Sequence, residues 1–206
     1  MSIGDHVKGL GTFSKKYNIP VYANKETWKA MPSQIEKISQ NNIKFFNFEK
    51  FNIGNLEINP FSIPHDAANP CGFNILKDKK KISIATDIGH MTSEILNILA
   101  KSSFLLLESN YDQEVLKCSP YPYALKQRIS GPYGHLSNSN AGKAISYLAN
   151  LGLNNVMLGH LSKENNFPEL AYKTVIEELI ENKINENNIR LSIANRDKLS
   201  SIIDVS

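Results

Sequence analysis

The stretch KISIATDIGHMTSEILNILAKSSFLLLESN at residues 81–110 decides the fold, because it places a helix pattern between two apolar runs. Thr92 or Ser93 followed by Glu94 is typical of a helix start, where a hydroxyl group can cap the first turn. The run FLLLESN at 104–110 begins with continuously apolar residues, as strands do when both faces of a parallel sheet are covered. The stretch therefore predicts a strand, a helix and a buried strand in succession.

The segments after residue 110 repeat this alternation. Residues 140–152 form a helix pattern, and residues 154–160 read as a second buried strand. Residues 168–183 form the longest helix pattern, with Pro168 suited to its first turn. Two closing strands are predicted at the C-terminus, at residues 189–194 and 199–205.

Shorter, β-like segments dominate the first half of the chain. A helix pattern at 7–18 stops before Pro20, and a second one at 25–38 is interrupted near Pro32. Strands are expected at residues 21–23, 43–48, 50–63 (with a hairpin turn at Gly54-Asn55), 71–76 and 81–86. Strands first and βα units later predict one α/β layered domain over residues 1–206, with its site at the strand ends.

Composition sets broad limits on the class of protein. A length of 206 residues with 41% hydrophobic residues is ample for one packed core, and a net charge of +3 permits a nucleic-acid surface without indicating one. No apolar run reaches the ~18 residues that a membrane span needs and no signal peptide is recognisable, so we expect a cytoplasmic protein. Cys71 and Cys118 follow no zinc-ribbon spacing, and we expect two free thiols.

The positions of the few histidines point to a metal site. Imidazole and carboxylate side chains at strand ends can converge although they lie far apart in the sequence, and together they suit ions such as zinc. Taken one at a time, each candidate is also explained as a helix cap or a hydrogen-bonded loop residue. The candidates are Asp5, His6, His65, Asp87, His135 and His160.

Other chemistries lack their motifs. Ser109 and Ser162 have no GxSxG elbow, and the chain contains neither a P-loop nor a GxGxxG turn. His90 follows Gly89 and reads as a helix-start residue. The combination of separated histidines with strand-end aspartates therefore favours metal-dependent chemistry.

Six motifs occur in an order that resembles the metallo-β-lactamase superfamily, and more closely its YycJ/WalJ-like branch of bacterial hydrolases. The resemblance runs from Asp5 to the C-terminus. It implies an α/β protein with an αββα four-layer sandwich, and two zinc (Zn2+) or manganese (Mn2+) ions that activate water against a phosphodiester. The branch is linked to exonuclease activity on DNA, so nucleic acid is the implied partner. The motifs are DHVKGLGTFSKKYNIPVYAN, PHDAANPCGF, ATDIGH, LLLESNYD, YPYALKQRISGPYGHLSN and LGHLSKENN.

The resemblance also assigns metal ligands residue by residue. Asp5 and His6 match the last two letters of the family's HxHxDH, and Asp5 would also orient or deprotonate the attacking water. His65 and His160 match the family's isolated histidine ligands. Asp87 matches the carboxylate that bridges the two metals.

A second group of residues is implied to act on the substrate. His135 matches a site histidine suited to protonating the leaving group rather than to binding metal. Side chains near it in the sequence could contact phosphate oxygens; these are Lys126, Arg128, Ser137 and Asn138.

The sequence departs from the family pattern at its start. Met1 and Ile3 stand where HxHxDH has its two leading histidines, and the first strands of the family's sandwich are not part of this sequence. We therefore expect an N-terminally truncated sandwich in which one metal position has too few ligands and activity is impaired. The alternatives are a non-catalytic remnant or binding module, and a metallohydrolase of small esters or amides, because the fold alone does not fix the substrate.

Overall fold

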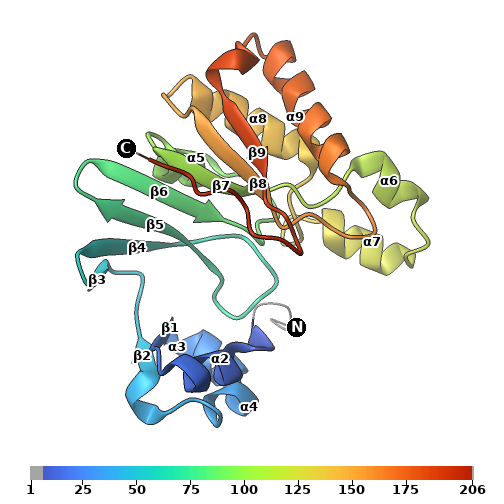
Figure 1. Cartoon of the computed structure of the whole chain (residues 1–206). Coiled ribbons are helices and arrows are strands. Elements are labelled where there is room, and N and C mark those ends of the chain that lie inside the picture. The colour runs from blue at the N-terminus through green and yellow to red at the C-terminus, as the bar shows by residue number, and fades with distance from the viewer. Residues whose placement is uncertain (1–6, 206) are drawn as a thin grey trace.

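Seven strands form the sheet on which the rest of the chain packs, in the order β3-β4-β5-β6-β7-β8-β9 (Figure 1). The computed structural model describes residues 7–205, so Asp5 and His6 lie outside the described residues. The strands are β3 (Phe51–Ile53), β4 (Leu56–Ser62), β5 (Cys71–Lys77), β6 (Lys80–Ala85), β7 (Phe104–Glu108), β8 (Asn155–Gly159) and β9 (Arg190–Ile193).

The direction of the strands changes halfway across this sheet. Strands β3 to β6 pair in antiparallel fashion, and the β3–β4 hairpin turns at Gly54, whose φ of 59° favours glycine. Strands β6 to β9 all pair in parallel, with Ala85 opposite Leu107 and Leu107 opposite Leu158. The carboxyl ends of β6, β7, β8 and β9 therefore meet at one edge of the sheet.

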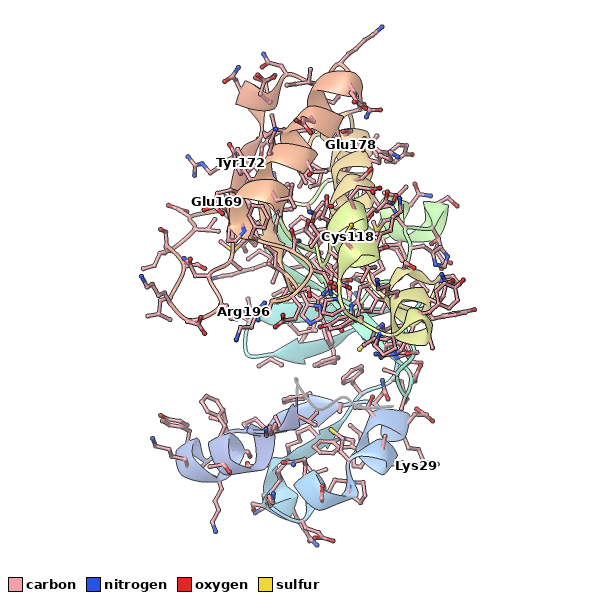
Figure 2. The ribbon with its side chains drawn as sticks, turned by 90° about the vertical axis from the view of Figure 1, so that its right-hand side faces the viewer. Lys29, Cys118, Glu169, Tyr172, Glu178 and Arg196 are labelled. Atoms are coloured by element: carbon pink, nitrogen blue, oxygen red, sulfur yellow. The ribbon has the colours of Figure 1, made fainter. Side chains whose placement is uncertain are left out.

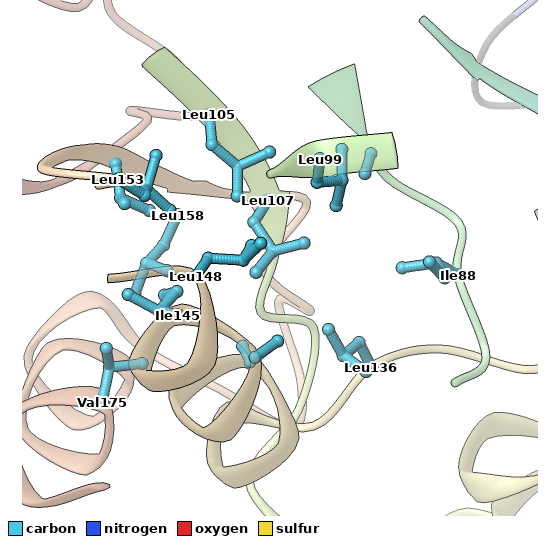
Figure 3. Close-up of a cluster of buried hydrophobic side chains, with 14 of the residues drawn as sticks. Ile88, Leu99, Leu105, Leu107, Leu136, Ile145, Leu148, Leu153, Leu158 and Val175 are labelled. Carbon is cyan, nitrogen blue, oxygen red and sulfur yellow. The ribbon is translucent and has the colours of Figure 1, made fainter. Parts of the chain in front are cut away.

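Three helices cover one face of the parallel half of the sheet: α5 (Ser93–Leu99), α8 (Asn138–Ala149) and α9 (Pro168–Glu181). Their apolar side chains meet those of β7 and β8 in the main core, where Leu105, Leu107 and Leu148 are fully buried (Figure 3). Helices α8 and α9 pack so closely at Gly142 that a Cβ added there would lie 2.6 Å from Cβ of Glu178. Only glycine therefore fits at this contact.

The N-terminal part forms a smaller layer on the other side of the large sheet (Figure 1). Its two-stranded parallel sheet and its helices share a separate core around Trp28 and Met31. Phe46 joins this layer to the large sheet through ring contacts with Phe51 and Phe73, at centroid distances of 5.3 and 5.8 Å. The elements are α2 (Leu10–Tyr17), β1 (Val21–Ala23), α3 (Lys25–Ala30), α4 (Pro32–Ile35), η1 (Gln40–Asn42) and β2 (Ile43–Phe45).

The mixed α/β architecture predicted from the sequence is confirmed, with two differences in its elements. Helices α6 (Gln113–Cys118) and α7 (Tyr123–Ser130) lie in a segment to which the sequence assigned no element. The prediction of a strand at residues 199–205 is wrong. The structure has no strand there, and Leu199 and Ile202 are 99% and 100% exposed. An apolar pattern is insufficient for a strand where no neighbouring strand pairs with it. The remaining element is the short helix η2 (Glu186–Asn188).

Within residues 7–205, every helix is too short or too polar to cross a lipid bilayer.

The packing of α8 against the sheet can be tested by truncation. Replacing the fully buried Leu148 with alanine is expected to lower the free energy of unfolding by about 2–5 kcal/mol, because the cavity left behind collapses only partly. Leu199→Ala is the matched control and should change it by less than about 0.5 kcal/mol. Urea denaturation measures both variants, and equal effects would contradict the assigned core.

Candidate metal centre

Residues at the carboxyl ends of three neighbouring parallel strands build the site. Asp87 follows β6, Glu108 is the last residue of β7, and His160 follows β8. Asp87 and His160 both have a φ of 55°, in the left-handed region where Asp and His are among the better tolerated residues. Such backbone conformations cluster at functional sites, because the surrounding structure must hold them in place.

Glu108 is fully buried beneath the site and is hydrogen-bonded on both carboxylate oxygens. Its Oε1 lies 2.8 Å from Nδ1 of His135 and 2.6 Å from Nδ1 of His160. Its Oε2 accepts backbone N–H groups from Ile88, at 2.8 Å, and Leu136, at 3.1 Å. One carboxylate therefore joins the strand ends of β6, β7 and β8 to the loop before α8.

The hydrogen bonds to Glu108 fix which ring nitrogens carry protons. Burial raises the pKa of Glu108, but the hydrogen bonds from His135 and His160 outweigh it and lower the pKa below its ordinary value. An ionised carboxylate only accepts hydrogen bonds, so both histidines donate through Nδ1. Each Nε2 atom then holds the lone pair that can bind an ion or exchange a proton.

His65 reaches the site from the antiparallel half of the sheet, on the loop that follows β4. Its Nδ1 lies 2.9 Å from the carbonyl oxygen of Gly134, which can only accept, so Nδ1 donates and Nε2 holds a lone pair. That Nε2 atom lies 3.5 Å from Oδ1 of Asp87 and 3.7 Å from Oδ1 of Asp66. A lone pair facing two carboxylate oxygens is favourable only when a proton or a cation lies between them.

The donor set fits a metal ion. Asp87, Glu108, His135 and His160 offer ligand atoms that all lie within 4.8 Å of one another. Oδ1 of Asp87 is 3.8 Å from Nδ1 of His160 and 4.0 Å from Nδ1 of His135, so the Asp87 carboxylate lies beside both rings, whose Nδ1 atoms donate to Glu108. Mixed nitrogen and oxygen donors of this kind suit zinc or manganese.

The structure brings four of the predicted site residues together. His65, Asp87, His135 and His160 form one group, with ring centroids 5.1 Å apart for His65 and His135 and 5.4 Å apart for His135 and His160. The predicted ligands Asp5 and His6 lie outside the described residues. His90, which was not among the candidates, is exposed, and its Nδ1 donates to the carbonyl of Pro132 at 2.8 Å.

Sequence reasoning missed Glu108. Its signal was a charged residue at the end of the continuously apolar run FLLLE, since a carboxylate in a strand buried on both faces needs polar partners. Those partners are backbone groups and histidines from distant segments, so the sequence alone did not identify them.

The residues predicted to contact phosphate divide into two groups. Arg128 binds Asp66 through two hydrogen bonds, of 2.6 and 2.9 Å, and this pairing lowers the pKa of the Asp66 carboxyl. Lys126 donates instead to the carbonyl of Lys117, near the end of α6. Ser137 and Asn138 are buried, so the prediction that they contact phosphate is wrong; they are turned inward as α8 begins.

Asn138 belongs to a buried polar network that supports the site. Its Oδ1 accepts from Oγ of Ser109 at 2.6 Å and from Nδ2 of Asn166 at 2.8 Å. Asn110 in turn donates from Nδ2 to the carbonyl of His160 at 2.8 Å. Such satisfied networks hold strand-end loops in one arrangement, which a metal site requires of its ligands.

The fold and this group of histidines and carboxylates define a metallo-β-lactamase fold protein. A family model described as a β-lactamase superfamily domain matches residues 4–161, which is more than half of the chain, and the chain belongs to this family. The structure of the metallo-β-lactamase fold protein YhfI from Bacillus subtilis has a TM-score of 0.64 to this chain at 14% identity, covering 92% of this chain and 70% of that one.

Within the superfamily, the chain belongs to the YycJ/WalJ-like branch. It is 35% identical over 178 residues to the exodeoxyribonuclease WalJ of Streptococcus pneumoniae, which covers 85% of this chain and 66% of that protein. It is 34% identical to the exodeoxyribonuclease YycJ of Bacillus anthracis, over 86% of this chain and 67% of the relative. The chain thus spans about two thirds of the length of these curated relatives.

The thiol of Cys71, which lies near the site, should react with alkylating agents differently from the exposed thiol of Cys118. Both cysteines are free, as predicted; Cys118 is exposed, whereas burial beside His65 and Asp87 raises the pKa of Cys71 to about 11. At pH 8 iodoacetamide should therefore modify Cys118 well before Cys71, and modification of Cys71 should accelerate as the pH rises towards 11. Mass spectrometry of digests measures this order. Faster labelling of Cys71 at pH 8 would contradict the described burial.

Proposed function

We propose that this chain is a metal-dependent hydrolase of phosphodiester bonds and that DNA is its substrate, on which it acts as an exonuclease. One observation carries the proposal: Oδ1 of Asp87 lies 3.5 Å from Nε2 of His65, whose lone pair faces it, and within 4.0 Å of the imidazole rings of His135 and His160. The exodeoxyribonuclease names of the two curated relatives support DNA as the substrate.

We assign the ions to positions on either side of Asp87. His65 and Asp87 would hold one ion, and Asp87 and His160, together with the predicted ligands Asp5 and His6, would hold the other. The position of Asp87 between His65 and His160, at 3.5 and 3.8 Å, supports its proposed bridging role. Zinc or manganese would supply Lewis-acid chemistry that polarises a phosphoryl oxygen and acidifies water.

We assign the two proton transfers of the hydrolysis to different side chains: His135 as the proton donor and Asp5 as the proton acceptor. His135 donates from Nδ1 to Glu108, so its Nε2 can carry a second proton towards the departing oxygen while the buried carboxylate stabilises the imidazolium. Asp5 is proposed to orient the attacking water and to take its proton. Arg128, already oriented by Asp66, would place positive charge beside the phosphate.

Impaired activity stays a prediction. Met1 and Ile3 replace the two histidines that the family motif places before Asp5 and His6, which weakens the position held by His65 and Asp87. The alternative is a non-catalytic binding module, and it rests on the same absence of histidine at positions 1 and 3.

The cellular location of the protein is part of the same proposal. We infer a cytoplasmic protein, because both cysteines of the chain are free and reducing compartments keep thiols in that state.

Substitution of site residues tests the hydrolase proposal. Asp87→Ala and His160→Ala should each lower hydrolysis of bis-p-nitrophenyl phosphate by at least about 100-fold, because each removes a proposed metal ligand. The matched control is His90→Ala, which removes an imidazole outside the group and should keep activity within about twofold. Zinc and manganese content is measured for every variant.

Three outcomes separate the readings. Stoichiometric metal with turnover that depends on Asp87 and His160 supports the hydrolase. Metal below one ion per chain, with no turnover by the unaltered protein, favours the binding module. Turnover of esters but not of phosphodiesters would replace the proposed substrate class.

A further inference from the structure

A cleft of about 580 Å³ opens beside the histidines, at the carboxyl ends of β8 and β9. Its lining includes His135 and His160 together with Arg128, Lys163 and Arg196. The cleft is thus continuous with the proposed metal centre. It extends beyond that centre along the loops that follow the two strands.

Basic side chains predominate in the lining of this cleft. The lining, which lies entirely within the described residues, contains Arg128, Lys163 and Arg196 and no Asp or Glu; Arg128 is paired with Asp66, which leaves Lys163 and Arg196 as the cations without an acidic partner in the lining. The chain as a whole is nearly balanced, with 23 basic and 20 acidic residues. Two of its only three arginines, Arg128 and Arg196, line the cleft. A basic groove next to a hydrolytic centre is the arrangement that a polyanionic substrate requires.

The fold fixes the positions of Lys163 and Arg196. Lys163 lies in the turn three residues after His160, and Arg196 follows β9, the next parallel strand. The Arg196 guanidinium donates to the carbonyl of Leu161, which holds this exposed side chain across the loop after β8. Figure 2 shows Arg196 at the level of the sheet rather than on the outer face of α9, where Glu169 and Tyr172 lie. Both cations therefore face the same cleft as His160.

We propose that Lys163 and Arg196 form a phosphate-binding subsite that holds the backbone of a single DNA strand leading into the metal centre. This proposal rests on the proposed function and names the form of its substrate. Arginine contacts phosphate with paired donors and lysine with a point charge, so the two side chains suit successive phosphates of one strand. Tyr121, also in the lining, offers an aromatic face against which a base can stack.

The size of the cleft favours a strand end over a duplex. Its volume lies within the roughly 300–1,000 Å³ of sites that enclose small molecules, which suits about one or two nucleotides. Bases of a duplex are paired and stacked, and would first have to separate before one strand entered such a site. A single-stranded end enters without that cost.

The test compares two double variants that each remove one lysine and one arginine. In K163A/R196A both removed charges line the cleft, whereas in the control K173A/R190A they lie on α9 and at the opposite end of β9. Anisotropy measures binding of the full-length metal-loaded chain to a fluorescent 12-nucleotide oligothymidylate with phosphorothioate linkages, between 50 and 200 mM KCl. A blunt 12-base-pair duplex is measured in parallel.

The subsite predicts a specific pattern. K163A/R196A should bind the single strand about 10- to 30-fold more weakly. The slope of log affinity against log salt should fall by about 1.4, because each phosphate that a cation neutralises on a single strand adds about 0.7 to that slope. K173A/R190A should stay within about threefold of the unaltered chain, and the duplex should bind at least tenfold more weakly than the strand.

The outcomes distinguish this subsite from the proposed function. Equal affinity and salt slope for the two double variants would overturn the subsite, even if the unaltered chain hydrolyses phosphodiesters. Equal binding of strand and duplex would overturn its preference for single strands. A cleft-dependent affinity in a chain that hydrolyses nothing would support the subsite and reject the hydrolase.

Discussion

The parallel pairing of β6, β7, β8 and β9 is the constraint on which the site depends. It sets the ends of four strands at one edge, so Asp87, Glu108 and His160 become neighbours although 73 positions separate the first from the last, and Arg196 lines the cleft beside His160. Burial of Leu105, Leu107 and Leu158 against α8 and α9 stabilises this pairing. The core therefore determines the separation of the side chains that would bind an ion.

Glu108 connects the aligned strand ends to the two histidines of the site. A buried carboxylate is stable only when its oxygens are satisfied, and here two backbone N–H groups and two imidazoles satisfy them. The same hydrogen bonds orient His135 and His160 towards Asp87. One residue thus links the stability of the sheet edge to the geometry of the proposed metal centre, and the buried Ser109, Asn138 and Asn166 network holds the adjoining loops.

The sequence predicted the elements of the parallel half well, because continuous apolar runs and helix caps such as Thr92 are local signals. It could not give the register that places Glu108 beside His160, 52 residues away. It also could not give side-chain direction, so Ser137 and Asn138 were expected to face substrate although the first turn of α8 buries them. The strand expected at 199–205 failed for a related reason, since strand formation needs a partner strand that an apolar pattern does not reveal.

The proposed metal centre requires that His65, Asp87 and His160 hold a cation, with His135 beside them. Anomalous diffraction from crystals grown with zinc, recorded on both sides of the zinc absorption edge, tests it most directly. We expect a peak within about 2.2 Å of the Asp87 carboxylate, on the side facing His160 or His65. Ordered density for all four side chains with no anomalous peak beside Asp87, at millimolar zinc and neutral pH, would show that these residues do not form a metal site.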